Sequence, residues 1–193
     1  RIMEEQEALK ILSDSDALLK GHFELRSGLH SNSFFQCANV LRYPHLAARL
    51  CGALAARMHA GLGSLLPPDT VIAPAMGGII VGHELARSLG VTSIFAEKQD
   101  GRLALRRFTI SPGERIVVAE DVITRGGRVQ ETIDIVNAKG GRVVAVGVLV
   151  DRSGGKAGFD YPLFSLLGLE PVTYEPAECP MCAEGAPLIH PGS

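Results

Sequence analysis

The 193-residue sequence contains no tryptophan, and aromatic residues make up only 5% of it. Its core must therefore be built from Ala, Val, Ile and Leu. The net charge is only −2, which provides no bulk attraction to nucleic acids or anionic lipids, and the apolar runs are far too short to span a bilayer. With 46% hydrophobic and 21% charged residues, the composition excludes a disordered chain and predicts a single soluble globular domain.

Cysteine is also scarce, with four residues in the chain. Cys37 and Cys51 lie in apolar or mixed segments, and we expect both to be buried. Cys179 and Cys182 form a lone C-x-x-C pair, with no second pair and no spaced histidine pair of the kind that zinc ribbons use. The cysteine pair could form half of an intermolecular metal site or act as a redox pair, but the pattern favours a turn in the tail. The stretch at residues 4–7 is acidic and polar, unlike a signal peptide, and we expect a cytoplasmic protein.

Glycine is abundant, with 22 residues, and several glycines separate apolar strand patterns from helical ones. The first 60 residues predict a helix at 4–20, a β-hairpin over 21–37, and a helix from Pro44 to Ala60 that Gly61 ends. The later strands are expected at 71–73, 91–96, 116–119 and 143–150, the helices at 79–88 and 128–138, and a two-stranded excursion at 98–108.

This alternation predicts an α/β fold with an open, mostly parallel sheet flanked by helices. We expect one domain over residues 1–193. It comprises a small N-terminal hood at about 1–42, a core at about 43–160 and a weakly patterned, proline-rich tail at about 161–193.

The richest loop follows the strand at 116–119, where Glu120 and Asp121 precede a turn with Thr124 and paired glycines that enters a helix. Ligands of parallel sheets bind beyond the carboxyl ends of the strands. A glycine turn at a helix N-terminus lets several N–H groups converge on a phosphate, while paired carboxylates suit a vicinal diol or a hydrated divalent cation. The loop matches neither G-x-x-x-x-G-K-[ST] nor G-x-G-x-x-G, which argues against Walker and dinucleotide sites. The alternative interpretation is that this segment is only an acidic strand end followed by an ordinary glycine turn, without a ligand.

The acidic pair and the Thr-x-Gly-Gly turn resemble the phosphoribosyl-pyrophosphate (PRPP) signature of type I phosphoribosyltransferases. Two further segments resemble orotate phosphoribosyltransferases. Residues 21–31, followed by Phe34 and Phe35, are similar to the N-terminal stretch that closes over the base in that family, and residues 150–155 are similar to its D-R loop. The resemblance covers about residues 20–155. It implies the type I fold and transfer of the 5-phosphoribosyl group from PRPP to orotate in pyrimidine biosynthesis, giving orotidine 5′-monophosphate and pyrophosphate.

Carried over position by position, the resemblance implies that Glu120 and Asp121 bind the ribose hydroxyls, while residues 124–128 hold the 5′-phosphate and residues 75–78 face the pyrophosphate. It implies Lys98 and Asp121 as catalytic residues. The implied PRPP-binding set is Arg26, Met76, Gly77, Lys98, Glu120, Asp121, Val122, Ile123, Thr124, Arg125, Gly126, Gly127 and Arg128.

The implied orotate-binding residues are Phe34, Phe35, Thr124 and Arg152. An arginine fork suits the carboxylate of orotate, whereas strand alternation puts the two phenylalanines on opposite faces, so a core position for one of them is the alternative. The resemblance also implies Mg²⁺ held mainly by PRPP, without direct protein ligands, and a homodimer.

The resemblance further implies that the segment at 98–108 closes over the substrates, excluding water. The sequence departs from the family pattern in three respects. Residues 98–108 contain no histidine, Gly77 stands where many members have lysine, and Arg125 and Arg128 replace small residues.

Two other functions stay open. A phosphoribosyltransferase for a neutral base would give Arg152 no carboxylate to bind. A PRPP-sensing regulator without catalysis would be expected to add a basic helix-turn-helix or an RNA-binding face, and the near-neutral composition indicates neither.

Overall fold

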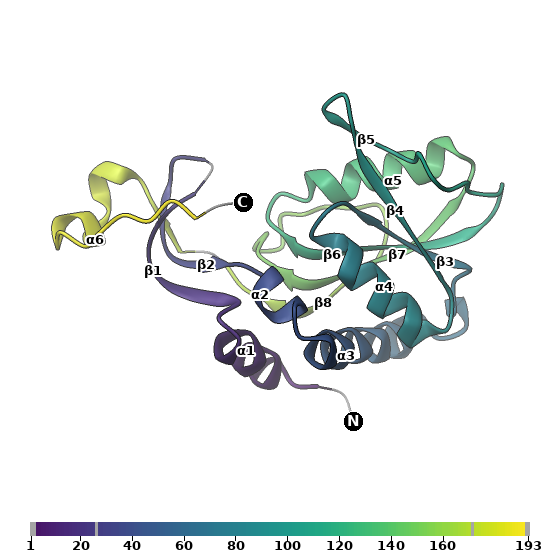
Figure 1. The fold of residues 1–193 in the computed structure, drawn as a ribbon, viewed down its shortest axis with the longest axis horizontal. Helices are drawn as coiled ribbons and strands as arrows, with labels where there is room; N and C mark the ends of the chain where they lie inside the picture. The colour runs from purple at the N-terminus through teal and green to yellow at the C-terminus, as the bar shows by residue number, and fades with distance from the viewer. Residues whose placement is uncertain (1–2, 26, 171, 192–193) are drawn as a thin grey trace.

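A six-stranded sheet forms the centre of the protein, for which a computed structural model describes residues 3–25, 27–170 and 172–191 (Figure 1). The strand order is β5-β4-β3-β6-β7-β8, and every pair is parallel except β4 and β5. This topology confirms the expected open, mostly parallel sheet. The strands are β3 (Thr70–Pro74), β4 (Thr92–Gln99), β5 (Arg102–Ala104), β6 (Arg115–Ile123), β7 (Arg142–Asp151) and β8 (Leu163–Gly168).

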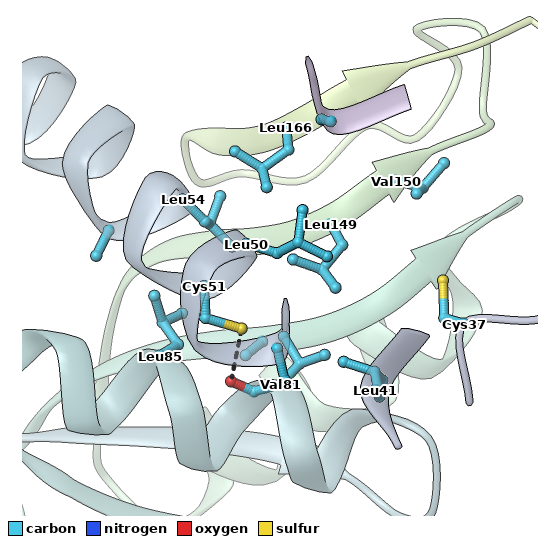
Figure 2. Packing of buried hydrophobic residues seen from close by; sticks show 14 of the residues in the cluster. Cys37, Leu41, Leu50, Cys51, Leu54, Val81, Leu85, Leu149, Val150 and Leu166 are labelled. Carbon is cyan, nitrogen blue, oxygen red and sulfur yellow. Dashed lines mark hydrogen bonds between the residues drawn. The ribbon is translucent and has the colours of Figure 1, made fainter. Parts of the chain in front are cut away.

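Helices cover both faces of this sheet, as expected for strands that are apolar on both sides. Side chains of α3 (Pro44–Leu62) and α4 (Gly78–Leu89) pack in one apolar cluster, and those of α5 (Gly127–Ala138) pack in a second. Figure 2 shows part of the first cluster, where the Cys51 thiol lies 3.8 Å from the carbonyl oxygen of Val81. Cys37 and Cys51 are both buried, as expected, and burial raises the pKa of Cys51 to about 12.

Helix α3 begins at Pro44, whose fixed φ suits a first helical turn, but it does not end at Gly61 as expected. It continues to Leu62, and Gly63, with φ of +52°, follows it. A Cβ atom at Gly61 would clash with the ring of Phe164 in β8. Gly61 therefore allows close packing of the helix against a strand and does not end the helix.

A second sheet forms the hood from β1 (Leu18–Glu24), β2 (His30–Phe35) and β9 (Thr173–Tyr174), with both pairs antiparallel. It confirms the expected hairpin but corrects the helix at 4–20. Helix α1 spans only Glu5–Asp14, because Leu18 and Leu19 pair with Phe35 and Phe34 in the hairpin. The short helix α2 (Ala38–Leu41) follows the hairpin, and the 3-10 turn η1 (Gly63–Leu65) follows α3.

The tail is more ordered than its composition predicted. Residues 163–168 form β8 of the central sheet, and β9 joins the hood. The turn η2 (Pro176–Glu178) and helix α6 (Pro180–Ala183) come next, and then Ile189 donates its N–H to the carbonyl of His22 at 2.8 Å. Ile189 thus returns to the hood, beside β1 (Figure 1). No helix in the described ranges has both the length and the apolar character needed to cross a bilayer.

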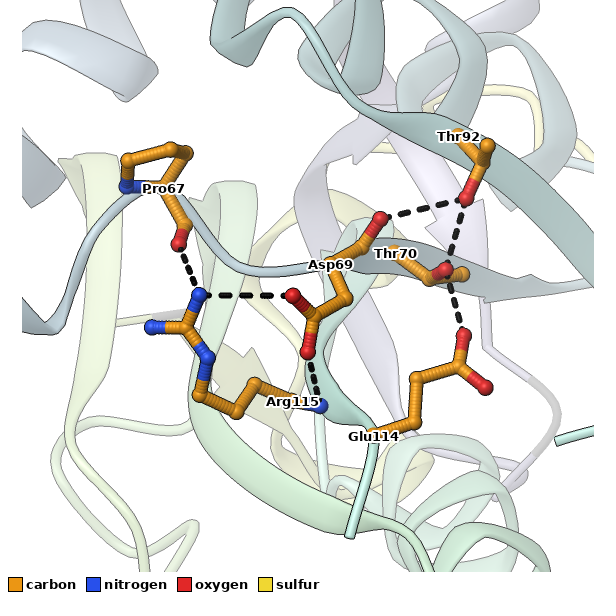
Figure 3. A network of polar contacts seen from close by, with 6 residues as sticks. All are labelled: Pro67, Asp69, Thr70, Thr92, Glu114 and Arg115. Carbon is orange, nitrogen blue, oxygen red and sulfur yellow. Dashed lines mark hydrogen bonds and ion pairs between the residues drawn. The ribbon is translucent and has the colours of Figure 1, made fainter. Parts of the chain in front are cut away.

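A polar network connects the amino-terminal ends of β3, β4 and β6 (Figure 3). The Asp69 carboxylate accepts a hydrogen bond from the backbone N–H of Arg115 at 2.8 Å and pairs with its guanidinium at 3.3 Å, and these bonds lower the pKa of Asp69. The Thr70 hydroxyl donates to Glu114 at 2.6 Å. The network holds neighbouring strands together at the edge of the sheet opposite their carboxyl ends.

Candidate active site

Two acidic side chains occupy the carboxyl end of the central strand β6. Glu120 is buried and accepts a hydrogen bond from the N–H of Asp121 at 3.1 Å, while the half-buried Asp121 accepts one from the N–H of Val122 at 2.7 Å. Burial raises the pKa of Glu120 well above its usual range, and the neighbouring Asp121 carboxylate raises it further. The pair can therefore both donate and accept hydrogen bonds, which suits a diol.

The loop that enters α4 lies directly against this acidic pair. A Cβ atom at Gly77 would lie 2.8 Å from Oδ2 of Asp121, and one at Gly78 would lie 2.7 Å from Oε1 of Glu120. The peptide bond between Ala75 and Met76 is cis, and the Met76 side chain is 83% exposed. The missing side chain at Gly77 thus leaves space that the Asp121 carboxylate occupies.

The turn after β6 leads into α5 through Gly126, which has φ of +78° and takes the N-cap position. A Cβ atom there would lie 2.7 Å from Cζ of Phe159, so both backbone conformation and packing require glycine. No side chain caps the helix and its first turn contains no acidic residue, which leaves its N-terminus suited to an anion. Thr124, Arg125, Gly127 and Arg128 are exposed around this turn.

Arg128 connects the two loops, because its guanidinium donates to the carbonyl of Ala75 at 3.4 Å. The next residues along β6 after the acidic pair differ in exposure. Val122 is half-buried, and Ile123 is buried in the apolar cluster that packs against α5. The Ile123 side chain therefore belongs to the core, although its carbonyl accepts a hydrogen bond from the N–H of Arg152 at 2.8 Å.

Arg152 follows β7 and is only 6% exposed. Its guanidinium carbon lies 5.3 Å from the centre of the Phe35 ring, and burial lowers the pKa of Arg152, although an arginine stays charged in proteins. Within the described residues, Arg152 forms no ion pair. A buried cation without an anionic partner is costly, so this position suits an anionic ligand.

The two phenylalanines of β2 do not lie together. Phe35 is buried against Arg152, whereas the Phe34 ring lies 5.9 Å from that of Phe23 within the hood. This arrangement follows from strand alternation and leaves only Phe35 beside the guanidinium. Arg26, expected to reach PRPP from the hood, lies outside the described residues.

Lys98 is an exposed residue of a β-hairpin formed by β4 and β5, where it pairs with Leu103. The hairpin confirms the two-stranded excursion expected at this point, and its turn uses Asp100 and Gly101 with positive φ. It projects beyond the rest of the central sheet (Figure 1). Arg107 is held by Glu97 at 2.9 Å, whereas Lys98 has no ion pair within the described ranges.

Comparison with known proteins agrees with this geometry. A family model described as the phosphoribosyl transferase domain matches residues 42–170. The curated orotate phosphoribosyltransferase of Heliobacterium modesticaldum is 51% identical over 192 residues, covering 99% of both chains. That of Desulforamulus reducens is 49% identical over 193 residues, covering 99% of this chain and 98% of its own. The chain belongs to the orotate phosphoribosyltransferase family.

Solved structures confirm the fold of this family member. The orotate phosphoribosyltransferase of Aeropyrum pernix is 26% identical, with a TM-score of 0.66 over 84% of this chain and 95% of its own. An adenine phosphoribosyltransferase from Thermoanaerobacter pseudethanolicus is 21% identical, with a TM-score of 0.60 over 71% of this chain and 88% of its own, and shows the shared fold alone.

Two side chains near the site of this family member were not predicted from the sequence. The Ser153 hydroxyl, next to Arg152, is buried and has no hydrogen-bond partner within the described residues. Phe159 packs beneath Gly126. Phe159 belongs to no recognised motif, whereas Ser153 lies within the D-R loop at 150–155 but was given no role there. A buried hydroxyl without a partner is a natural contact for a polar ligand.

Proposed function

We propose that this chain transfers the 5-phosphoribosyl group from PRPP to orotate, through the residues assembled at the carboxyl ends of β6 and β7. The observation that carries the proposal is Arg152, which is buried, unpaired within the described residues and packed against Phe35. A planar ring bearing a carboxylate satisfies such a group, because an arginine fork binds a carboxylate through two charge-assisted hydrogen bonds. A neutral base would leave the buried charge unpaired, which disfavours its binding.

The reaction is a displacement at the anomeric carbon of PRPP. A ring nitrogen of orotate forms the new bond and passes its proton to the departing pyrophosphate or to water, and the bond to pyrophosphate breaks with its electrons leaving on the pyrophosphate. Such chemistry needs little covalent participation by the protein, so positioning and charge stabilisation supply the rate enhancement. The protein accordingly needs no nucleophile.

In this proposal Glu120 and Asp121 bind the ribose hydroxyls, and the turn at 124–128 with the α5 N-terminus binds the 5′-phosphate. Hard carboxylate oxygens also suit hydrated Mg²⁺ held mainly by PRPP, and the bound ion would neutralise charge on the departing pyrophosphate. Lys98 approaches the pyrophosphate when the β4–β5 hairpin closes. A homodimer and a cytoplasmic location remain predictions.

The role of Arg152 is tested by Arg152→Ala, with Arg142→Ala as the control because Arg142 is an exposed arginine at the start of β7, the strand that Arg152 follows. Truncating one partner of a buried charged pair costs about 2–5 kcal/mol, so KM for orotate should rise by about 30-fold to several thousand-fold. KM for PRPP should change by no more than a few fold. An equal loss of affinity for both substrates would contradict the proposed role of Arg152.

A further inference from the structure

Four potential metal ligands converge where the tail meets the hood. His22 comes from β1, His30 from β2, Cys179 is the N-cap residue of α6, and Cys182 lies within α6. One nitrogen or sulfur atom from each residue lies within 4.8 Å of the others. The histidines are each 4% exposed and Cys179 is 3% exposed, while Cys182 lies at the surface. The sequence favoured a simple turn for the cysteines because the histidine pair lies about 150 residues earlier along the chain.

Three of the distances between these atoms match those of a tetrahedral site, and all four atoms lie within 4.8 Å of one another. Nε2 of His22 lies 3.4 Å from Sγ of Cys179 and 3.6 Å from Sγ of Cys182, and Nδ1 of His30 lies 3.4 Å from Sγ of Cys182. For zinc bonds of about 2.0–2.1 Å to nitrogen and about 2.3 Å to sulfur, tetrahedral angles place nitrogen and sulfur about 3.5 Å apart. The two nitrogens are 2.9 Å apart and would separate by roughly 0.4 Å on metal binding.

The outer hydrogen bond of His22 gives an independent indication. Its Nδ1 lies 3.0 Å from the carbonyl oxygen of Ala186. Because a carbonyl oxygen can only accept, Nδ1 is the donor, and in the neutral ring Nε2 then presents its lone pair to the two sulfur atoms and His30. Metal-binding histidines characteristically donate their other N–H to a carbonyl or carboxylate in this way.

The backbone of the hairpin also places His22 for this role. Between Lys20 and Phe23, two residues of β1 stand opposite the single residue Asn32 of β2, which forms a β-bulge. A bulge redirects side chains, and here His22 and Phe23 are both buried although they are consecutive. His22 consequently lies against His30 with ring centres 4.8 Å apart.

We propose that His22, His30, Cys179 and Cys182 bind a structural Zn²⁺ ion that joins the C-terminal tail to the hood hairpin. Two thiolates and two imidazoles in tetrahedral geometry select zinc among common cellular metals, and four protein ligands leave no open position for catalysis. The site lies at the opposite end of β2 from Phe35, about 16 Å along the strand. It therefore stabilises the hood at a distance from Phe35 and Arg152, and zinc binding does not depend on the transfer reaction.

The direct test is the metal content of the full-length protein, purified under reducing conditions with zinc supplied and dialysed. Wild type should contain one zinc per chain by plasma mass spectrometry, and Cys182→Ser should lose at least nine-tenths of it. Replacing zinc with Co²⁺ should produce the visible absorption of tetrahedral cobalt and a thiolate charge-transfer band. His190→Ala, which changes an exposed histidine of the same tail, should retain full metal content.

A second measurement follows the tail itself. The chain has no lysine or arginine after Lys156, but Glu178 and Glu184 flank the cysteine pair, so a glutamate-specific protease probes this segment. Removing zinc with a chelator should speed cleavage at these sites at least tenfold, and zinc but not Mg²⁺ should reverse the change. Cys182→Ser should be cleaved at the fast rate with or without the chelator.

Three results would overturn the proposal. One is less than a tenth of a zinc per wild-type chain after zinc was supplied. Another is unchanged metal content in Cys182→Ser, which would place any bound zinc elsewhere. The third is a disulfide between Cys179 and Cys182 that persists under reducing conditions, since the site requires both thiolates.

Discussion

The substitution Glu120→Gln should stabilise the free protein while impairing its reaction. Burial raises the pKa of Glu120 from 4.5 to about 9, with the Asp121 carboxylate adding to the effect. Between these pH values the folded protein retains a proton that the unfolded chain has released, so stability falls as pH rises. The free energy of unfolding of the wild type then falls by up to about 1.4 kcal/mol per pH unit, and this dependence is absent in Glu120→Gln.

From pH 6 to pH 8, the stability of Glu120→Gln relative to wild type should therefore increase by up to about 3 kcal/mol. For a chain of this length, each kcal/mol shifts Tm by roughly 2–4 °C. The difference in Tm between Glu120→Gln and wild type should therefore increase by up to about 10 °C from pH 6 to pH 8. Thermal unfolding at both pH values without substrates measures the difference, with Glu5→Gln, at an exposed position, as the control. kcat/KM for PRPP should fall in Glu120→Gln. A difference in Tm that does not change with pH would refute this reasoning.

Three further experiments test other parts of the account. Gly126→Ala should destabilise the fold by about 1–3 kcal/mol in chemical unfolding, because its φ is +78° and the added Cβ meets a ring; an equal loss in Gly158→Ala, where there is free space, would argue against this cause. The variants Lys98→Ala and Asp121→Asn should each be inactive, and their subunits can be mixed and allowed to re-form dimers. If the hairpin of one subunit acts at the site of its partner, random pairing of subunits should restore up to about a quarter of wild-type activity. No recovery in verified mixed dimers would exclude action in trans. Asp69→Asn should lower the free energy of unfolding at neutral pH. Because the pKa of Asp69 is lowered in the folded protein, its carboxylate stabilises the fold above the usual carboxyl pKa, and this stabilisation is lost as pH falls through the pKa of the folded state. A loss of stability in Asp69→Asn that stays constant into acid would contradict this.

The central sheet could be predicted because its signals are local. Pro44 begins α3, Gly90 ends α4 in a left-handed conformation, and Gly126 begins α5, each through its own backbone preference. Long-range pairing determined the parts that were not predicted. Leu18 and Leu19 fit a helical period, but they pair with β2 instead.

Strand β8 was missed for a similar reason. It lies at the edge of the sheet, and its placement depends on pairing with β7 and on the close approach of Gly61 to Phe164. The return of the tail to the hood depends on contacts with residues more than 100 positions earlier, such as the bond from Ser31 to Val172. No local pattern encodes contacts of this kind.

The position of the candidate site at the strand ends could be predicted because its groups follow strands in recognisable motifs, while the roles of those groups remain predictions. The acidic pair, the glycine turn and Arg152 are all brought to the same edge of the sheet, and strand alternation anticipated that Phe34 and Phe35 would separate. Ser153 could not be predicted, because its significance lies in being buried without a partner. The histidine–cysteine cluster likewise exists only through tertiary contact.

The most direct test of the proposed function is to follow the absorbance of orotate when the protein is mixed with orotate, PRPP and Mg²⁺. Parallel reactions should contain uracil or adenine in place of orotate. We predict that orotate is consumed with release of one pyrophosphate per molecule, whereas the neutral bases react at least a hundredfold more slowly. Unchanged orotate together with consumption of a neutral base would contradict the assignment of Arg152 and of the reaction, and PRPP binding without turnover of any base would indicate a regulator instead.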